Sequence, residues 1–222
     1  MTLKKKRNVF VAAITSLLLL AACNDDSSSS PITPSNNEQS SSSIGEFVES
    51  GFMTDSRDGQ SYKIVKIGNQ TWMAQNLNYE TANSYCYDND SANCTKYGRL
   101  YTWAAAKTAC PSGWYLPSND AWEILFTELG GQSTAGKVLK STSEWNNNGN
   151  GTDAYGFSAL PAGKSDDCGY FNSVSEFTKF WSATPNYFEY YAYCMQLFYD
   201  SDYASLSVFN TNNGFSVRCL KY

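Results

Sequence analysis

The chain contains no histidine among its 222 residues. This absence excludes imidazole metal ligands, Ser-His-Asp and Cys-His catalytic groups, and pH switches based on histidine. Catalysis by a pair of carboxylates and calcium binding through oxygen ligands stay open, because neither needs an imidazole. The chain also has no Cys-x-x-Cys pair, which argues against a zinc knuckle and against a thioredoxin-type redox site.

The N-terminal apolar run is too short to span a membrane. It extends from Val9 to Leu20, about 12–14 residues, whereas a membrane-spanning helix needs roughly 20. Basic residues, Lys4 to Arg7, precede the run, and Ala21-Ala22-Cys23 follows it. A basic segment, a short apolar segment and small residues in this order are typical of a secretory signal.

The segment Leu20-Ala21-Ala22-Cys23 resembles the lipobox of bacterial lipoproteins. In that family the cysteine sulfur receives a diacylglyceryl group, the chain is cleaved before the cysteine, and the new N-terminus is acylated. We therefore expect residues 1–22 to be a signal peptide and Cys23 to carry the lipid, whose acyl chains contribute about 0.8 kcal/mol per buried CH₂. A short membrane anchor and a plain secretory signal with an incidental cysteine are the alternatives.

The charge of the chain limits its partners. The signal contains four basic residues and no acidic one, so its removal takes the formal charge from −5 to −9. An acidic protein is a poor partner for nucleic acid or anionic headgroups, both of which prefer Lys/Arg patches. We expect no nucleic-acid partner, and we expect membrane attachment through the N-terminal lipid.

Six cysteines remain after Cys23, an even number that in an exported chain indicates three structural disulfides. Arithmetic alone allows fifteen connectivities. The six are Cys86, Cys94, Cys110, Cys168, Cys194 and Cys219.

Composition divides the remaining chain in two. Residues 23–54 are rich in Ser, Asn, Asp and Pro up to about Ser43, and such a segment buries too little apolar surface to fold, so a disordered tether is expected. Residues 55–222 are aromatic and Gly-punctuated, with a length that suits one domain with one core. The patterns in this part predict an α+β fold with two short helices and several short antiparallel strands.

Local patterns place these elements. Ser61–Ile67 and Gln70–Met73, joined by Gly68-Asn69, predict a β-hairpin. Helices are predicted at Trp103–Thr108 and at Ser118–Leu129, where Ser118 is the expected N-cap. Further strands are predicted at Phe157–Leu160, Phe180–Thr184, Tyr191–Tyr199, Tyr203–Phe209 and Phe215–Leu220.

Long motifs in a fixed order resemble one known family. They are Asp58–Tyr62, Trp72–Leu77, Gly98–Trp103, Cys110–Ser118, Phe180–Thr184 and Gly214–Cys219. In this order they resemble the Fibrobacter succinogenes major paralogous domain, over roughly residues 55–222. That family is in turn similar to C-type-lectin-like folds and to the formylglycine-generating-enzyme fold, so the resemblance implies a loop-rich, disulfide-stapled domain of this kind.

The resemblance also implies a pairing of the cysteines. It implies a bridge between Cys110 and Cys219, which ties the end of the first predicted helix to the last predicted strand. The remaining cysteines would then form a Cys168–Cys194 bridge and a local Cys86–Cys94 bridge.

Calcium-dependent sugar binding has little support in the sequence. The chain lacks the Glu-Pro-Asn, Gln-Pro-Asp and Trp-Asn-Asp tripeptides of the sugar-binding C-type lectins. Calcium needs six to eight oxygen ligands, and the loop Asn147–Asp153 offers one carboxylate, Asp153. We expect no cofactor, with Asp153 as the calcium candidate. Further acidic residues lie in other loops, namely Asp88, Asp90, Asp166 and Asp167.

Aromatic residues make up 15% of the chain and crowd the segment between residues 187 and 209. Outward-facing tyrosines suit flat sugar rings and protein partners alike, because they offer contact area at a low entropy cost. Most of these rings are nevertheless expected in the core. The crowded residues are Tyr187, Phe188, Tyr190, Tyr191, Tyr193, Phe198, Tyr199, Tyr203 and Phe209.

The expected function is recognition rather than catalysis. The formylglycine-generating relatives use reactive cysteines, and pairing of all six cysteines here would leave no thiol for that chemistry. We expect a lipid-anchored protein of the cell envelope, most simply of the outer membrane, that recognises a carbohydrate or an envelope protein in adhesion. The alternatives are a structural or assembly scaffold without a small ligand, and an enzyme of the formylglycine-generating kind.

Overall fold

The computed structural model describes residues 49–222, so the expected signal peptide, Cys23 and most of the expected tether lie outside the described residues. The strands are β1 Ser50–Thr54, β2 Ser61–Ile67, β3 Gln70–Met73, β4 Ser84–Tyr85, β5 Leu100–Tyr101, β6 Trp114–Tyr115, β7 Lys164–Ser165, β8 Phe171–Asn172, β9 Phe177–Pro185, β10 Tyr191–Phe198, β11 Ser205–Asn210 and β12 Leu220–Lys221. The helices are α1 Ser91–Tyr97, α2 Trp103–Ala109, α3 Asn119–Glu128 and α4 Gln132–Leu139, with 3₁₀ turns η1 Tyr87–Asn89 and η2 Asn146–Asn148. The fold of these residues is α+β, as predicted.

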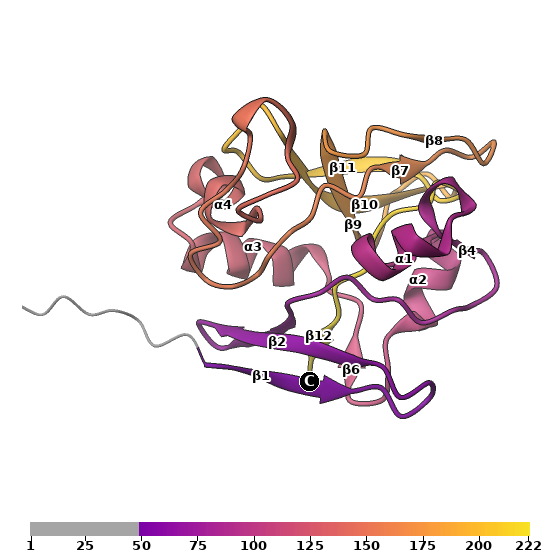
Figure 1. The fold of residues 1–222 in the computed structure, drawn as a ribbon, viewed down its shortest axis with the longest axis horizontal. Helices are drawn as coiled ribbons and strands as arrows, with labels where there is room; N and C mark the ends of the chain where they lie inside the picture. Colours follow the sequence, from indigo (N-terminus) through magenta and orange to yellow (C-terminus); the bar gives the residue numbers. More distant parts are fainter. Residues whose placement is uncertain (1–48) are drawn as a thin grey trace, which may run out of the picture. The chain divides into compact units, whose positions relative to one another are not determined.

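A five-stranded antiparallel sheet lies on one side of the domain, with the strand order β1-β2-β3-β12-β6 (Figure 1). The predicted hairpin is confirmed, since Ile64 pairs with Met73 and Ile67 with Gln70. Strand β12, near the C-terminus, inserts between β3 and β6 through Leu220, which pairs with both Trp72 and Tyr115. The chain ends of the domain are therefore joined within one sheet.

The folded part begins earlier than the sequence predicted. The composition places Ser50–Thr54 in the tether, but this segment forms β1 and pairs with β2 along its whole length, from Ser50 opposite Val65 to Thr54 opposite Ser61. Nothing in the local pattern marks this strand, because all five of its residues are exposed or half-buried. An edge strand of this kind lacks the apolar alternation that marks a buried one.

A second sheet has the strand order β11-β10-β9. The strands predicted at Phe180–Thr184, Tyr191–Tyr199 and Tyr203–Phe209 are confirmed within a few residues. The other two predictions are wrong, because Phe157–Leu160 and most of Phe215–Leu220 make only isolated bridges. Both segments are apolar because they cross the core, and their backbone groups bond to several different neighbours.

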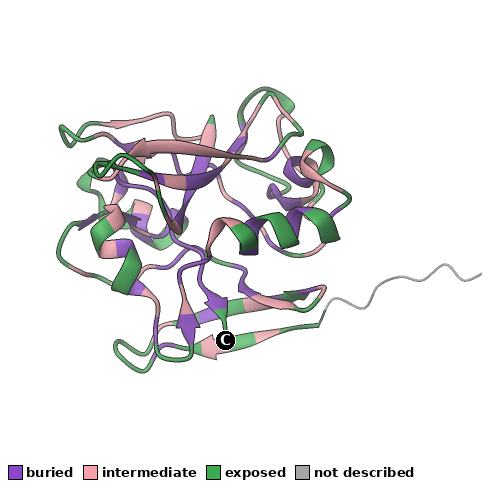
Figure 2. Ribbon diagram, turned by 180° about the vertical axis from the view of Figure 1, so that it is seen from behind, coloured by how far each residue is buried: buried purple, intermediate pink, exposed green. Residues whose placement is uncertain are grey.

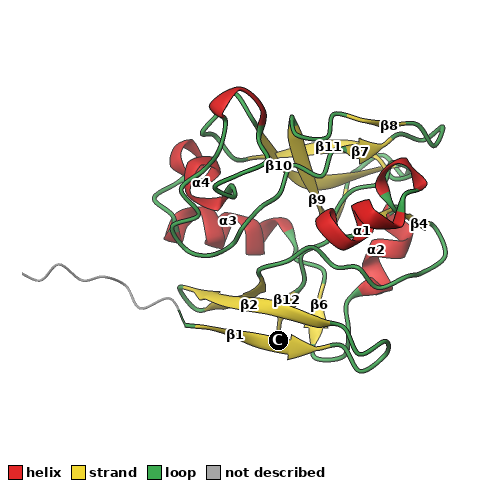
Figure 3. Cartoon of the chain, viewed as in Figure 1, coloured by secondary structure: helices red, strands yellow, loops and turns green. Residues whose placement is uncertain are grey.

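Residues 49–222 form α1 to α4, twice as many helices as predicted; Figure 3 shows them in red. Helices α2 and α3 are confirmed, and the Ser118 hydroxyl caps α3 by accepting the N–H of Ala121 at 3.3 Å. Helices α1 and α4 are short and polar on the outside, so their sequences resemble the loops around them. Within residues 49–222, none of the helices has the length and hydropathy that a membrane span requires.

The core is rich in aromatic residues, and each helix turns a buried face towards it (Figure 2). One cluster contains Trp72, whose ring centroid lies 4.6 Å from that of Trp122, and it joins the five-stranded sheet to α3. A second cluster surrounds Trp181 and Phe215, whose centroids are 4.4 Å apart. Burying such rings stabilises the fold by roughly 1.5–3 kcal/mol each.

Two of the three implied disulfides are present. Cys110 is bonded to Cys219, and Cys86 is bonded to Cys94. The third is not, because Cys168 and Cys194 are both unbonded in the described part of the chain. Cys194 is buried in β10, whereas Cys168 lies exposed in the turn between β7 and β8, so the two thiols occupy different environments.

Candidate functional site

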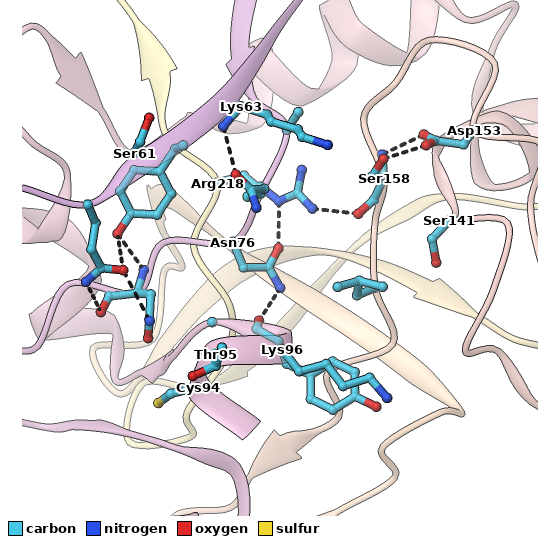
Figure 4. Close-up of a pocket in the computed structure, with 18 of the residues that line it drawn as sticks. Ser61, Lys63, Asn76, Cys94, Thr95, Lys96, Ser141, Asp153, Ser158 and Arg218 are labelled. Carbon is cyan, nitrogen blue, oxygen red and sulfur yellow. Dashed lines mark hydrogen bonds between the residues drawn. The ribbon is translucent and has the colours of Figure 1, made fainter. Parts of the chain in front are cut away.

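A polar pocket of about 600 Å³ opens beside the β2–β3 hairpin (Figure 4). This volume lies within the range of small-molecule sites. Four further segments complete its lining: helix α1, the loop after α4, the Asp153–Ser158 loop and the chain just before β12. The pocket is lined by Gln60, Ser61, Tyr62, Lys63, Ala74, Gln75, Asn76, Asn78, Cys94, Thr95, Lys96, Tyr97, Gly98, Ser141, Thr142, Ser143, Asp153, Ser158, Leu160 and Arg218.

Helix α1 is held against the hairpin at the pocket wall. Its end is fixed by Asn76, whose Nδ2 donates to the Tyr97 carbonyl oxygen at 2.8 Å. Gly98 follows with φ 73°, and a Cβ there would lie 2.9 Å from the Leu77 carbonyl oxygen, so a larger residue would push the helix away. The Cys86–Cys94 bridge fixes the same helix to the preceding loop.

The guanidinium of Arg218 lies beneath the pocket and is fully buried. Its Nε donates to Asn76 Oδ1 at 2.6 Å, and its Nη1 donates to the carbonyl oxygens of Met73 and Phe157 at 3.1 and 2.5 Å. Its Nη2 donates to the Ser158 carbonyl oxygen at 2.9 Å. Every acceptor is electrically neutral, so the cation joins three segments without forming an ion pair.

The electrostatics of Arg218 follow from this burial. Desolvation lowers the pKa of its guanidinium, and the charge of the Asp153 carboxylate opposes that shift. Arginine still keeps its proton in proteins, since it has no acceptor and its pKa starts above 12. The pocket therefore lies above a permanent, unpaired positive charge.

Neutral polar side chains make up half of the lining. Ten of the twenty lining residues are Ser, Thr, Asn or Gln, which donate and accept hydrogen bonds without a fixed charge. Tyr62 adds a hydroxyl that accepts the N–H of Asn78 at 3.1 Å. Burial raises the pKa of Tyr62 to about 12, so this hydroxyl stays protonated at neutral pH.

Asp153, the calcium candidate, lines the pocket but has a local partner for each oxygen. Its Oδ1 accepts the backbone N–H of Ser158 at 2.6 Å, and its Oδ2 accepts the Ser158 hydroxyl. Both residues have positive φ, 49° and 52°, so the carboxylate holds a tight loop closed. Within residues 49–222 Asp153 belongs to no cluster of three or more acidic or cysteine side chains that could hold a metal ion. The geometry gives Asp153 a structural role.

The other acidic candidates do not converge on Asp153. Asp90 caps α1 by accepting the N–H of Ala92, and Asp88 lies in η1. Asp166 and Asp167 lie close together beside Cys168. There Oδ1 of Asp166 accepts the N–H groups of Cys168 and Tyr170, which stabilises the β7–β8 turn.

The crowded aromatic segment is more exposed than expected. Its three most exposed rings, Tyr187, Phe188 and Tyr190, belong to the β9–β10 turn, where the exposed fraction of Tyr187 reaches 96%. The expectation that most rings of the segment belong to the core is wrong, because each is exposed or half-buried. The turn is ordered by Asn186, whose N–H donates to the Tyr191 carbonyl oxygen at 3.0 Å.

The unbonded cysteines remove one argument against catalysis, namely that all six cysteines are paired. Pairing of all six cysteines was expected to leave no thiol, yet Cys168 and Cys194 are free in the described part of the chain. Burial raises the pKa of Cys194 to about 12, and a thiol that holds its proton is a poor nucleophile. Neither cysteine lines the polar pocket.

Lys179 in β9 is a second buried cation and supports a prediction about pH. Its Nζ lies 3.9 Å from the ring centroid of Phe177 and 4.5 Å from that of Phe209. Burial lowers its pKa from 10.5 to about 8. Between about pH 8 and 10.5 the unfolded chain therefore binds more protons than the folded chain. The free-energy cost of burying the protonated lysine is fully present below pH 8 and decreases as the pH rises through this range.

We expect Lys179→Met to raise the free energy of unfolding at pH 7 by about 1–3 kcal/mol. Urea unfolding at pH 7 and pH 9.5 measures the effect. The gain over the wild type should shrink at the higher pH, where the wild-type lysine is already neutral. A gain that is equal at both pH values would contradict this origin.

Sequence reasoning did not find the pocket. It named Arg218 and Gly98 only as parts of motifs and Cys94 only as a disulfide partner, and it assigned no role to Lys63 or Thr95. A signal for Arg218 was available, because a lone arginine within the apolar run Phe215–Leu220 has to be satisfied by hydrogen bonds. No local sequence pattern indicates that the five separated segments of the lining meet at one pocket.

Comparison with known proteins gives one match. Residues 65–221 match the family model described as the Fibrobacter succinogenes major domain. No curated protein and no solved structure matches the chain. The match includes α1, the loop after α4, the Asp153–Ser158 loop and Arg218, and leaves out the pocket residues at the start of β2. The motifs and the family match agree, and the chain belongs to the Fibrobacter succinogenes major domain family.

Proposed function

We propose that this domain binds a carbohydrate in the polar pocket, without catalysis, as part of a lipid-anchored protein of the cell envelope. The observation that carries the proposal is the lining, in which ten of twenty residues are Ser, Thr, Asn or Gln. A ligand with many hydroxyl groups matches such a surface, because each hydroxyl both donates and accepts hydrogen bonds. An apolar ligand would leave these groups unpaired and bind poorly.

The proposal includes no metal or other cofactor and no reaction. The calcium candidate Asp153 already holds Ser158 through both oxygens, so we expect EDTA to leave binding unchanged. Loss of binding on EDTA treatment would instead favour a calcium site. The free thiols lie outside the pocket lining, which supports recognition over chemistry of the formylglycine-generating kind.

Filling the pocket tests the proposal. Thr95 lies exposed on α1 at the pocket wall, and a tryptophan there would occupy part of the pocket. We expect Thr95→Trp to weaken binding of oligosaccharides by at least about tenfold, or roughly 1.4 kcal/mol. Calorimetric titration with the hits of a glycan array measures the loss.

Thr108→Trp is the matched control for this change. Thr108 is also exposed on a helix, and its hydroxyl donates to the Ala105 carbonyl oxygen as that of Thr95 does to Ser91. It does not line the pocket, so its variant should bind like the wild type. Equal affinities of the two variants would overturn the pocket as the site, and an array without hits would favour the scaffold function.

Attachment through Cys23 makes a separate prediction. We expect Cys23→Ala to abolish fatty-acid labelling and to release the protein from membranes, because several acyl chains are needed for stable anchoring. Labelled palmitate and membrane fractionation measure both effects. A variant that keeps its label and its membrane fraction would contradict the proposed anchor. For the anchored wild-type protein, protease treatment of intact cells distinguishes display on the outer surface, where the domain is lost, from a periplasmic position, where it is protected.

We also propose that the fold is of the C-type-lectin-like kind. Two features support this: the Cys110–Cys219 bridge between the end of α2 and the segment before β12, and the turn Leu116-Pro117-Ser118 that opens α3. The additional helices α1 and α4 depart from the two-helix pattern that the resemblance implied.

A further inference from the structure

The charges that line the pocket differ in sign from the chain as a whole. The lining contains three cations, Lys63, Lys96 and Arg218, and one carboxylate, Asp153, whereas the chain has a formal charge of −5. Lys96 is paired outside the lining, since its Nζ lies 2.5 Å from the carboxylate of Glu144. The positive character of the pocket therefore depends on Lys63 and Arg218.

Arg218 supplies charge from beneath the pocket floor. A fully buried cation without a paired anion is energetically costly, and an anion bound nearby lowers that cost. Four of its five N–H donors are bonded to neutral acceptors. Because its side chain is fully buried, we expect it to act on a ligand through its field, which low-dielectric surroundings transmit strongly.

Lys63 supplies a cation that a ligand can contact directly. It lies on the exposed face of β2, and in Figure 4 its side chain extends across the pocket towards Ser158. The structure records no carboxylate paired with it among residues 49–222. The one lining carboxylate, Asp153, directs both oxygens to Ser158. An ammonium with no partner in a pocket of hydroxyls and amides suits a ligand that carries a carboxylate among its hydroxyl groups.

We propose that the pocket prefers acidic sugars, with the carboxylate of a uronic acid bound at Lys63 above the buried Arg218. This inference rests on the proposed function, because it names the ligand class of the same site. The ammonium of Lys63 would donate to the carboxylate, and the neutral polar residues of the lining would bond to the ring hydroxyls. Hydrogen bonds between charged groups are stronger than those between neutral ones, so the carboxylate gives the specificity.

The test uses the full-length protein and matched pairs of ligands. Trisaccharides of galacturonate, glucuronate and mannuronate are each compared with their carboxyl-reduced forms by calorimetric titration. For at least one pair we expect the acidic form to bind about tenfold or more tightly. Lys63→Gln should remove most of that preference, while binding of the reduced form changes little. Raising the salt concentration should weaken the acidic ligand more than the neutral one.

Lys66→Gln is the matched control, because Lys66 lies on the same strand, is exposed, and is paired with Glu49 away from the pocket. Equal affinities for acidic and reduced forms, or a Lys63→Gln variant that keeps the preference, would overturn the acidic-sugar inference while the carbohydrate proposal stands. If neither form of any pair binds, and no array sugar binds, both proposals fail together.

Discussion

Replacing Cys110 and Cys219 together by alanine is expected to lower the free energy of unfolding by about 4–5 kcal/mol. The two residues are 109 positions apart, so their bridge closes a loop that includes α3, α4 and the second sheet. The unfolded chain without the bridge gains the conformational freedom of that loop, and this gain is the main source of the loss. Urea unfolding of the wild type and the variant measures it.

The second bridge provides the control for this prediction. Cys86 and Cys94 are only eight positions apart, so the same chain-entropy relation gives about 2–3 kcal/mol for their replacement. The long bridge should therefore stabilise the domain by about 2 kcal/mol more than the short one. The reverse order would contradict the entropic explanation, and it would indicate that contacts of α1 depend on the short bridge.

Arg218→Met is expected to lower the free energy of unfolding by about 3 kcal/mol or more. The change removes a buried cation, which by itself favours folding, but it leaves four acceptors without their donor. A buried acceptor without a partner costs about 1–3 kcal/mol, so the four together outweigh the relief. Urea unfolding again measures the effect, with the slope of the transition showing whether the native state stays compact.

Two variants separate this explanation from a simple effect of charge. Arg218→Lys keeps the charge, but one ammonium does not reach acceptors spread around the plane of a guanidinium, so it should lose nearly as much stability. Lys66→Met removes an exposed charge with a surface partner and should cost less than about 1 kcal/mol. Full stability of Arg218→Lys would show that the charge, and not the hydrogen bonds, matters at this position.

The sequence predicted the elements whose signals are local. The hairpin of β2 and β3 has alternating apolar residues and a Gly-Asn turn, and α3 has a serine cap and an apolar stripe that ends at Gly130. Such signals depend only on neighbours in the chain. Helix α1 has the Asp90 cap but only two buried residues, and a disulfide and Asn76 hold it in place. Helix α4 has no side-chain cap and packs through Gly136 against the backbone of Asp202.

The pocket could not be predicted because its chemistry comes from distant segments. Lys63 and Arg218 are 155 positions apart in the sequence and lie in the same pocket through the pairing of β3 with β12. Arg218 can be identified as an unpaired cation only when its hydrogen-bond acceptors are known to be neutral, and the sequence does not reveal those acceptors. The predicted disulfide between Cys168 and Cys194 is wrong because it rested on the family resemblance alone. In the fold Cys194 is buried in β10 and Cys168 is exposed, and the two are not bonded.

An amide NMR titration of the full-length protein tests the central proposal most directly, with the oligosaccharide that binds most tightly in the calorimetric panel. Carbohydrate binding in the pocket predicts that shifted signals come from its lining, above all from Ser61, Gln75 and Thr95. Signals of the β9–β10 turn, where Tyr187 and Tyr190 are exposed, should stay in place. Shifts confined to that turn, or none in the pocket, would contradict the proposal.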